Sequence, residues 1–230
     1  MKKQILITGC SSGFGLALTH LYLDKGYRVF GVSRTNPNIE NENFIFQSCD
    51  LQELSTIKQN LSGFLQKIKT LELVYLNAGM LGEIKSSLEI STEELKKVYE
   101  LNVYANKELL DILRGIDVKT IIGISSGAAV NGSKGWAGYS LSKAGLNMLL
   151  NLYAKEMTQT KLLAVAPGVI ETAMTDVIRY ELDDVEFPSA KKLKEGTIQT
   201  PKEAAIRMDQ FTAKIEKFES GSFVDVRDIS

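Results

Sequence analysis

The amino-acid sequence predicts an α/β fold, a single Rossmann-like doubly wound parallel sheet with helices on both faces. Short apolar runs alternate along the chain with longer segments of helical periodicity, and this alternation is typical of a parallel sheet covered on both sides. The first apolar run also passes directly into a glycine-rich turn and then into a helical pattern. That order is typical of the units that bind phosphate groups at the edge of such sheets.

Length and composition indicate one domain over residues 1–230. With 44% hydrophobic residues the chain can bury a substantial core, and α/β units of this length commonly form a single domain. Two cysteines, Cys10 and Cys49, and one histidine, His20, cannot form a familiar zinc site or a disulfide framework. We therefore expect no bound metal.

The charge balance argues against two classes of partner. The chain has 27 Lys and Arg residues against 28 Asp and Glu residues, so it lacks the basic surface that binds nucleic acid or an anionic membrane. No apolar run approaches the ~20 residues that span a bilayer. Because Met1–Lys3 lead directly into a strand pattern rather than a signal peptide, we expect a cytoplasmic protein.

The first expected strand, Gln4–Thr8, ends in the glycine-rich turn Gly9–Gly15, and a helix follows that ends near Lys25-Gly26. Strand, turn and helix in this order direct backbone N–H groups and the positive end of the helix dipole at one place, which suits a pyrophosphate. The turn has neither the lysine of a P-loop nor the spacing G-x-G-x-x-G. The alternative is a turn that simply connects a strand to a helix.

The second expected strand, Tyr27–Val32, ends at Ser33 and Arg34. An NAD-binding unit usually carries an acidic residue at this point for the ribose 2′-hydroxyl, whereas an arginine can pair with a 2′-phosphate. Ser33 and Arg34 therefore favour NADP(H), and the alternative is an ordinary surface arginine.

A third strand, Phe44–Phe46, is followed by Asp50 and Leu51. Ligands bind at the carboxyl ends of strands in open sheets of this kind. Asp50 either accepts a hydrogen bond from an adenine amino group or caps a helix that starts near Gln52.

The fourth strand, Leu73–Leu76, runs into Asn77-Ala78-Gly79. Ser91–Glu94 has the form of a capping box and begins a long helix that reaches Leu113. Asn102 lies within this helix, where asparagine is a mediocre helix former. It needs a functional reason only if it faces the cleft.

The fifth strand, Thr120–Ile124, leads to Ser126, and Tyr139 and Lys143 follow at the start of an apolar-periodic run. Residues four apart lie on one face of a helix, so the Lys143 ammonium is expected to lower the pKa of the Tyr139 phenol from roughly 10. Tyr139 then becomes a usable proton donor, and Ser126 can direct its hydroxyl at the same reacting oxygen. The alternative is a chance pair on a solvated helix face.

The sixth strand, Leu162–Ala166, is stopped by Pro167-Gly168. Residues at about 170–199 mix acidic side chains with lysines and break the pattern, and we expect a mobile flap over the cleft, called the flap below. Thr200–Glu203 combines an N-cap, a proline at the first helical position and a glutamate at N3, which predicts a last helix. Ser222–Val226 is expected to form a final short strand.

Together these motifs resemble the short-chain dehydrogenase/reductase family over essentially the whole chain. Each motif is weak alone, but their order and spacing are specific. The residues that carry the resemblance are Thr8-Gly9-x-x-x-Gly13-x-Gly15, Asn77-Ala78-Gly79, Asn102, Ser126, Tyr139-x-x-x-Lys143 and Pro167-Gly168. The resemblance implies hydride transfer between a nicotinamide cofactor and a carbonyl or alcohol.

The resemblance also implies a role for each polar residue. Tyr139 is the general acid, Ser126 hydrogen-bonds the same carbonyl oxygen, and Lys143 binds the nicotinamide ribose and lowers the pKa of the tyrosine. Asn102 holds a water that links Lys143 to solvent, and Thr172 bonds the nicotinamide carboxamide. The residues expected to bind NADP(H) are Gly9, Ser11, Ser12, Phe14, Gly15, Ser33, Arg34, Asp50, Leu51, Asn77, Ala78, Gly79, Tyr139, Lys143, Pro167, Gly168, Ile170 and Thr172.

A narrower resemblance is to the sepiapterin reductase and bacterial benzil reductase branch, whose members reduce diketones and similar activated carbonyls with NADPH. It is carried by Lys134-Gly135-Trp136, Glu171-Thr172-Ala173-Met174, Phe187-Pro188 and the ending Ser220–Asp225. The implied substrate-binding residues are Ser126, Trp136, Met174 and Asp225.

Three of these points stay open in the sequence. In the sepiapterin enzymes the aspartate at the position of Asp225 anchors the pterin, but Asp225 equally suits a cap or a pair within the last strand. Trp136 either walls the substrate pocket or packs under the flap. Ser12 stands where the family carries an arginine, so Arg34 has to provide most of the preference for NADPH.

We therefore expect an NADPH-dependent carbonyl reductase for vicinal diketones or activated ketones. One alternative is a 3-oxoacyl-carrier-protein reductase, which would need a basic docking patch near the cleft. The other is a non-catalytic NADPH-sensing module. By resemblance, the protein is expected to form a homodimer through the helices that carry Lys143 and Asn102.

Overall fold

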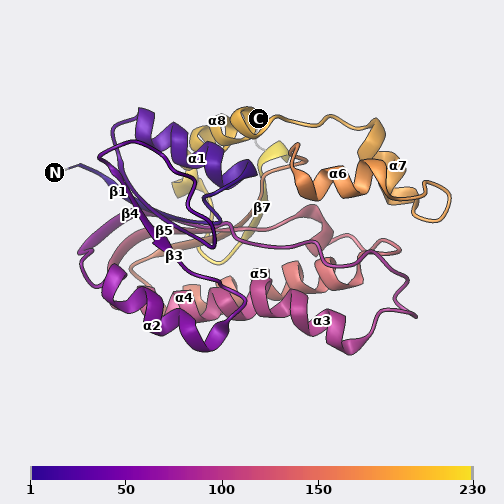
Figure 1. Cartoon of the computed structure of the whole chain (residues 1–230), viewed down its shortest axis with the longest axis horizontal. Coiled ribbons are helices and arrows are strands. Elements are labelled where there is room, and N and C mark those ends of the chain that lie inside the picture. The colour runs from indigo at the N-terminus through magenta and orange to yellow at the C-terminus, as the bar shows by residue number, and fades with distance from the viewer. Residues whose placement is uncertain (1, 229–230) are drawn as a thin grey trace.

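Parallel strands form one sheet in the order β3-β2-β1-β4-β5-β6-β7 in the computed structural model of the protein, which describes residues 2–228 (Figure 1). The strands are β1 (Gln4–Thr8), β2 (Arg28–Ser33), β3 (Phe44–Ser48), β4 (Thr70–Leu76), β5 (Asp117–Ile124), β6 (Lys161–Ala166) and β7 (Phe223–Asp225). The α-helices are α1 (Gly13–Asp24), α2 (Leu54–Leu65), α3 (Thr92–Tyr99), α4 (Ala105–Leu113), α5 (Ala137–Glu156), α6 (Ala173–Tyr180), α7 (Pro188–Glu195) and α8 (Pro201–Thr212). Shorter helical turns are η1 (Glu100–Tyr104), η2 (Gly127–Ala129), η3 (Ile215–Lys217) and η4 (Val226–Asp228).

Helices cover both faces of the sheet, with α1 and α8 on one face and α2, α4 and α5 on the other (Figure 1). Successive residues of β1 point to opposite faces, so Leu6 packs with the α2, α4 and α5 cluster while Ile5 and Ile7 pack with the α1 and α8 cluster. Because both faces are buried, the central strands are almost continuously apolar. The predicted fold and its strands are confirmed.

Two of the expected helix starts are also confirmed. The Ser91 hydroxyl accepts a hydrogen bond from the backbone N–H of Glu94 at 3.2 Å, and Thr200 does the same for Glu203 at 3.3 Å. Each glutamate carboxylate accepts a bond in return from its N-cap residue's backbone N–H. Both are therefore complete capping boxes.

Two local predictions hold only in part. The long helix expected from Ser91 to Leu113 is present, but a π-helical turn, η1, lies within it and contains the fully buried Asn102. Helix α2 begins at Leu54 rather than near Gln52, and Asp50 does not cap it. Instead a carboxylate oxygen of Asp50 accepts the backbone N–H of Gln52 at 3.0 Å, which is a local turn that competes with helix formation.

The flap is more regular than its mixed composition indicated. It contains helices α6 and α7, which extend beyond the sheet in Figure 1. Both pack against Leu81 and Trp136 through an apolar cluster that includes Ile178, Phe187 and Ala190. The mobility of the flap stays a prediction.

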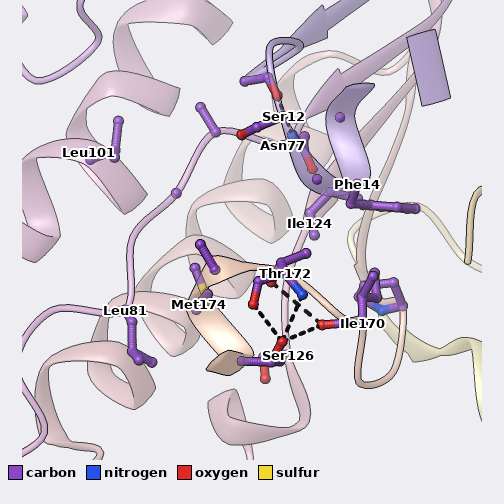
Figure 2. Close-up of a pocket in the computed structure, with 18 of the residues that line it drawn as sticks. Ser12, Phe14, Asn77, Leu81, Leu101, Ile124, Ser126, Ile170, Thr172 and Met174 are labelled. Atoms are coloured by element: carbon purple, nitrogen blue, oxygen red, sulfur yellow. Dashed lines mark hydrogen bonds between the residues drawn. The ribbon is translucent and has the colours of Figure 1, made fainter. Parts of the chain in front are cut away.

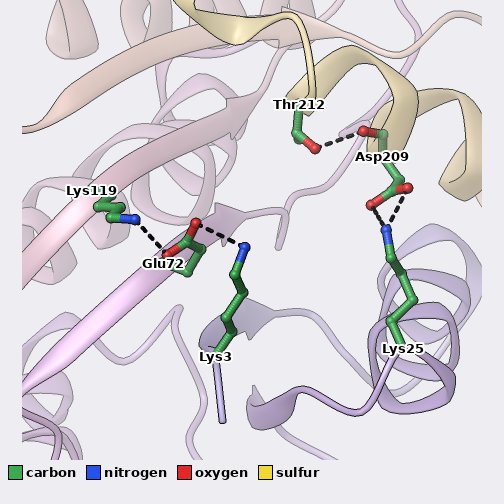
Figure 3. A network of polar contacts seen from close by, with 6 residues as sticks. All are labelled: Lys3, Lys25, Glu72, Lys119, Asp209 and Thr212. Carbon is green, nitrogen blue, oxygen red and sulfur yellow. Dashed lines mark hydrogen bonds and ion pairs between the residues drawn. The ribbon is translucent and has the colours of Figure 1, made fainter. Parts of the chain in front are cut away.

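Charged side chains pair with one another toward the amino ends of the central strands (Figure 3). Glu72 of β4 lies 3.4 Å from Lys3 and 2.9 Å from Lys119 of β5, and Lys25 contacts Asp209 of α8 at 2.6 Å. Each exposed pair contributes little stability. These charges are satisfied within the protein, so they leave no evident demand for a ligand at this edge.

Among residues 2–228, no helix has the length and apolarity that crossing a membrane requires.

Candidate active site

A cavity of about 510 Å³ opens at the carboxyl ends of the central strands. Ser12, Phe14 and Asn77 lie at one end of it, and Ser126, Thr172 and Met174 lie at the other (Figure 2). All the residues expected to bind NADP(H) line this cavity. The residues that the sequence assigned to cofactor binding therefore line one continuous cavity.

The glycine-rich turn packs so closely against its neighbours at Gly9 and Gly15 that neither position can carry a side chain. A Cβ atom on Gly15 would lie 2.1 Å from the Gly9 carbonyl oxygen, and Gly9 itself has φ of +67°. The Asn77 amide donates to the carbonyl oxygens of Thr8 at 2.9 Å and Gly9 at 3.3 Å. The end of β4 thus holds the turn in place at the start of α1.

The ends of β2 and β3 form another part of the lining. Ser33, Arg34, Asp50 and Leu51 all lie there, and the Arg34 side chain is exposed. Cys49 also lines this end, although no motif in the sequence indicated it. Burial raises the pKa of the Cys49 thiol, so the thiol stays protonated and unreactive near neutral pH.

Strand β5 and helix α5 bring Ser126, Tyr139 and Lys143 together at the cavity. The Ser126 hydroxyl accepts the backbone N–H of Ala128 at 3.1 Å, which fixes it at the start of η2. The Lys143 ammonium is 4% exposed, donates to the Ile124 carbonyl oxygen at 2.8 Å and lies 5.6 Å from the centre of the Tyr139 ring. The structure thus groups the three side chains as expected.

The electrostatics of Tyr139 differ from the expectation. Burial raises the pKa of its phenol, and a hydrogen bond with Ser126 only partly offsets this increase. Burial also lowers the pKa of Lys143 to about 8. The expected lowering of the tyrosine pKa by Lys143 is absent because desolvation dominates and the ammonium directs a proton at the Ile124 carbonyl rather than at the phenol.

Asn102 is adjacent to this group but does not line the cavity. Its side-chain amide accepts the backbone N–H of Met80 and donates to the Met80 carbonyl oxygen and the Ser142 hydroxyl, each at 2.9 Å. A Cβ atom on Gly79 would lie 3.1 Å from the Asn102 amide oxygen and 3.3 Å from the Lys143 nitrogen. Asn102 therefore fixes the backbone beside Lys143, and its expected water-holding role stays a prediction.

Apolar side chains form the wall beyond Tyr139. Trp136 is 6% exposed, and its ring lies 6.2 Å from that of Tyr139. Both sequence-based alternatives for Trp136 describe the structure, because it lines the cavity and also donates its indole N–H to Ser189 of the flap at 2.6 Å. Met174 lines the cavity as expected, together with three residues that no motif indicated: Leu81, Ile178 and Leu193.

Asp225 lies outside the cavity lining. One of its carboxylate oxygens accepts the backbone and Nε protons of Arg227, each at 2.9 Å, and the other accepts the Nη2 proton at 2.6 Å. This pairing within the C-terminal segment is the alternative that the sequence left open. A pterin contact would require the Arg227 guanidinium to move, so anchoring by Asp225 stays a prediction.

The comparisons with known proteins bear on this geometry. The profile of the short chain dehydrogenase family matches residues 3–183. The chain belongs to this family. It is accordingly an oxidoreductase that acts on a carbonyl or hydroxyl group.

A benzil reductase ((S)-benzoin forming) of Bacillus subtilis (strain 168) is 33% identical over 213 residues, which span 85% of this chain and 87% of the relative. The crystal structure of the Saccharomyces cerevisiae short-chain dehydrogenase/reductase YIR035C superposes with a TM-score of 0.82 at 25% identity, over 99% of this chain and 97% of that one. ElxO, solved with NADP bound, has the same fold, with a TM-score of 0.79 at 22% identity over 98% of this chain and 97% of that one.

We predict that the buried Lys143 makes stability depend on pH. Its native pKa of about 8 lies below the value of 10.5 for a free lysine. The unfolded chain therefore binds more protons between these values, and stability rises with pH across them. Chemical denaturation without nucleotide should show wild type gaining about 2 kcal/mol relative to Lys143→Met between pH 7 and 9.5.

The control for this prediction is Lys155→Met, because Lys155 lies on the same helix with a side chain that is 63% exposed. The difference in free energy of unfolding between wild type and Lys155→Met should stay constant over the same pH range. A constant difference between wild type and Lys143→Met across the range would contradict the low pKa.

Proposed function

We propose that the protein is an NADPH-dependent carbonyl reductase that acts on vicinal diketones or similarly activated ketones, with Tyr139 as the general acid. One observation carries this proposal. A single cavity joins the glycine-rich turn to Ser126, Tyr139 and the buried Lys143, and then to an apolar wall. It therefore has room for a dinucleotide at one end and a carbonyl substrate at the other.

The glycine-rich end fits a dinucleotide. Gly9 and Gly15 let the turn pack closely on the end of β4, which places the N-terminus of α1 at the cavity, and a helix N-terminus favours anionic phosphate. Arg34 favours the 2′-phosphate of NADP(H), since its exposed guanidinium borders the same cavity. Binding of NADP by ElxO, which shares this fold, supports the choice.

The reacting groups suit reduction of a carbonyl. A bound nicotinamide supplies the hydride to the carbonyl carbon. Tyr139 donates its proton to the carbonyl oxygen, and its raised pKa keeps that proton in place near neutral pH. Ser126 hydrogen-bonds the same oxygen. Lys143, with a pKa of about 8, carries its positive charge at neutral pH beside the tyrosine.

The wall of the cavity favours a neutral, apolar substrate. Leu81, Trp136, Met174, Ile178 and Leu193 supply carbon and sulfur surface around the Tyr139 end, and such surface favours aromatic or aliphatic groups flanking the carbonyl. The similarity to a benzil reductase supports diketones as the substrate class.

We predict that the purified protein oxidises NADPH in the presence of benzil and a simple vicinal diketone. Sepiapterin and an acetoacetyl thioester complete the panel and test the neighbouring substrate classes. Tyr139→Phe should lower kcat by about 10²–10⁴-fold, the usual contribution of a general acid, with NADPH binding retained.

Two results would overturn these assignments. Tight NADPH binding without turnover of any panel member would exclude the proposed substrates and favour a sensing module. Substantial turnover by Tyr139→Phe would show that another group donates the proton.

We also predict that Arg34 sets the cofactor preference. Arg34→Asp removes a charge-assisted hydrogen bond to the 2′-phosphate, so the ratio of kcat/KM for NADPH to that for NADH should fall about 10- to 100-fold. Arg114→Asp is the matched control, since Arg114 follows α4 and lies outside the cavity lining. An unchanged ratio in Arg34→Asp would show that another residue reads the phosphate.

We further propose a homodimer through α5 and the helices around Asn102. Leu141, Met148 and Leu152 of α5 are 49%, 59% and 55% exposed, and Tyr104 of η1 is 48% exposed. Burial of such surface against a second copy is favourable. Sedimentation should show a dimer for wild type and a monomer for the double variant Met148→Glu and Leu152→Glu.

The dimer test has a control elsewhere on the surface. Leu88 is 96% exposed and lies on the loop before α3, so Leu88→Glu should remain dimeric. A monomeric wild type at micromolar concentration would refute the proposal.

A further inference from the structure

The flap contacts the short loop that precedes helix α5 and carries Trp136. The indole N–H of Trp136 donates to the hydroxyl of Ser189, in the first turn of α7, at 2.6 Å. This bond joins two segments that are 53 residues apart in the chain. The bond connects Trp136, which forms part of the apolar wall of the cavity, to the flap.

The buried indole N–H of Trp136 requires a hydrogen-bond acceptor. The side chain is 6% exposed, and a buried indole N–H without an acceptor costs about 1–3 kcal/mol. Its ring lies 6.2 Å from the Tyr139 ring and borders the cavity. The Ser189 hydroxyl therefore satisfies the one polar atom of the side chain that forms the wall next to the proposed acid.

The other contacts between the flap and this loop are apolar packing and exposed charge pairs. The ring of Phe187 occupies the space above Gly135, where a Cβ atom would lie 2.6 Å from it. Lys134 lies 5.5 Å from the centre of the same ring and 3.6 Å from Glu186, with both charged side chains 52% exposed. These contacts bring the flap and the loop together through apolar packing and exposed charges, whereas the Ser189 hydroxyl bonds the indole N–H itself.

We propose that Ser189 is a positioning residue for substrate selection. By holding the indole of Trp136, it fixes the part of the wall next to Tyr139 and links the position of that indole to the position of α7. Ser189 does not line the cavity, so it acts through Trp136 and touches neither substrate nor cofactor. Substrates with a ring that reaches the wall, such as diaryl diketones, depend on this orientation, and small aliphatic diketones do not.

The turnover part of this inference rests on the proposed carbonyl reduction, but its spectroscopic part does not. Trp136 is the one tryptophan of the chain, so intrinsic fluorescence reports its surroundings directly. In Ser189→Ala the indole loses its acceptor and becomes free to move toward water. We expect a red-shifted emission and stronger quenching by acrylamide than in wild type.

The kinetic experiment compares benzil with butane-2,3-dione. For Ser189→Ala we expect KM for benzil to rise about 5- to 20-fold, while KM for butane-2,3-dione and kcat for both stay within about twofold. Ser189→Thr keeps the hydroxyl and should restore both the fluorescence and the KM. Glu186→Gln removes an exposed contact of the same junction and should leave every value near wild type.

Each outcome decides the matter. Unchanged emission and quenching in Ser189→Ala would overturn the inference, whether or not benzil is a substrate. Changed fluorescence with equal KM changes for the two diketones would overturn the role in selection, as would a fall in kcat for both. If the wild type reduces neither diketone, the proposed function and the role of Ser189 in selection between diketones are both overturned, whereas an unchanged KM for benzil in Ser189→Ala beside an active wild type overturns only the role in selection.

Discussion

Parallel pairing of the strands is the constraint on which the rest of the structure depends. It directs the carboxyl ends of β1, β2, β4, β5 and β6 toward one edge, while the helical connections cover both faces with apolar side chains. Polar residues placed just after these strands therefore meet one another, although they are far apart in the sequence. The opposite edge receives charged residues that pair among themselves, such as Glu72 with Lys119.

A second constraint is the burial of Lys143 at the carboxyl ends of the strands. Lys143 is almost fully buried, and no carboxylate of residues 2–228 forms an ion pair with it. A buried ammonium without a counter-ion is costly, which is why its pKa falls. The Lys143 ammonium, which loses its proton more readily than a free lysine, thus lies next to the Tyr139 phenol, which holds its proton more firmly than a free tyrosine. The Asn102 side chain makes three hydrogen bonds, to both backbone groups of Met80 and to the Ser142 hydroxyl, and so fixes the backbone beside Lys143.

The features that the sequence predicted correctly have strong local signals. Glycines, capping residues and apolar runs mark the ends of the strands and helices, and the order of the motifs determines which of those ends carry functional groups. The capping boxes at Ser91 and Thr200 illustrate this, because residues three apart determine each helix start without help from the rest of the chain. The cavity end at Ser33 and Arg34 was predictable for the same reason.

The errors concern properties that depend on the packed interior. The direction of the Tyr139 pKa follows from desolvation, and spacing along a helix does not contain that information. Leu81, Ile178 and Leu193 resemble ordinary core residues until the flap is folded, so their place in the wall was hidden. A pair for Asp225 within the C-terminal segment was one of the alternatives, but nothing in the sequence indicated Arg227 as the partner.

The π-helical turn at Asn102 has a consequence for how its helix meets the remainder of the protein. Such a turn adds one residue to a helical repeat of 3.6, which rotates everything beyond it by roughly 100° relative to an uninterrupted helix. Helix α3 packs against α5, whereas α4, on the other side of the turn, packs against α2 as well. One continuous helical segment thus presents differently phased faces to different neighbours. Deleting a single residue in the turn would force one of its two halves to rotate its apolar stripe away from its partner.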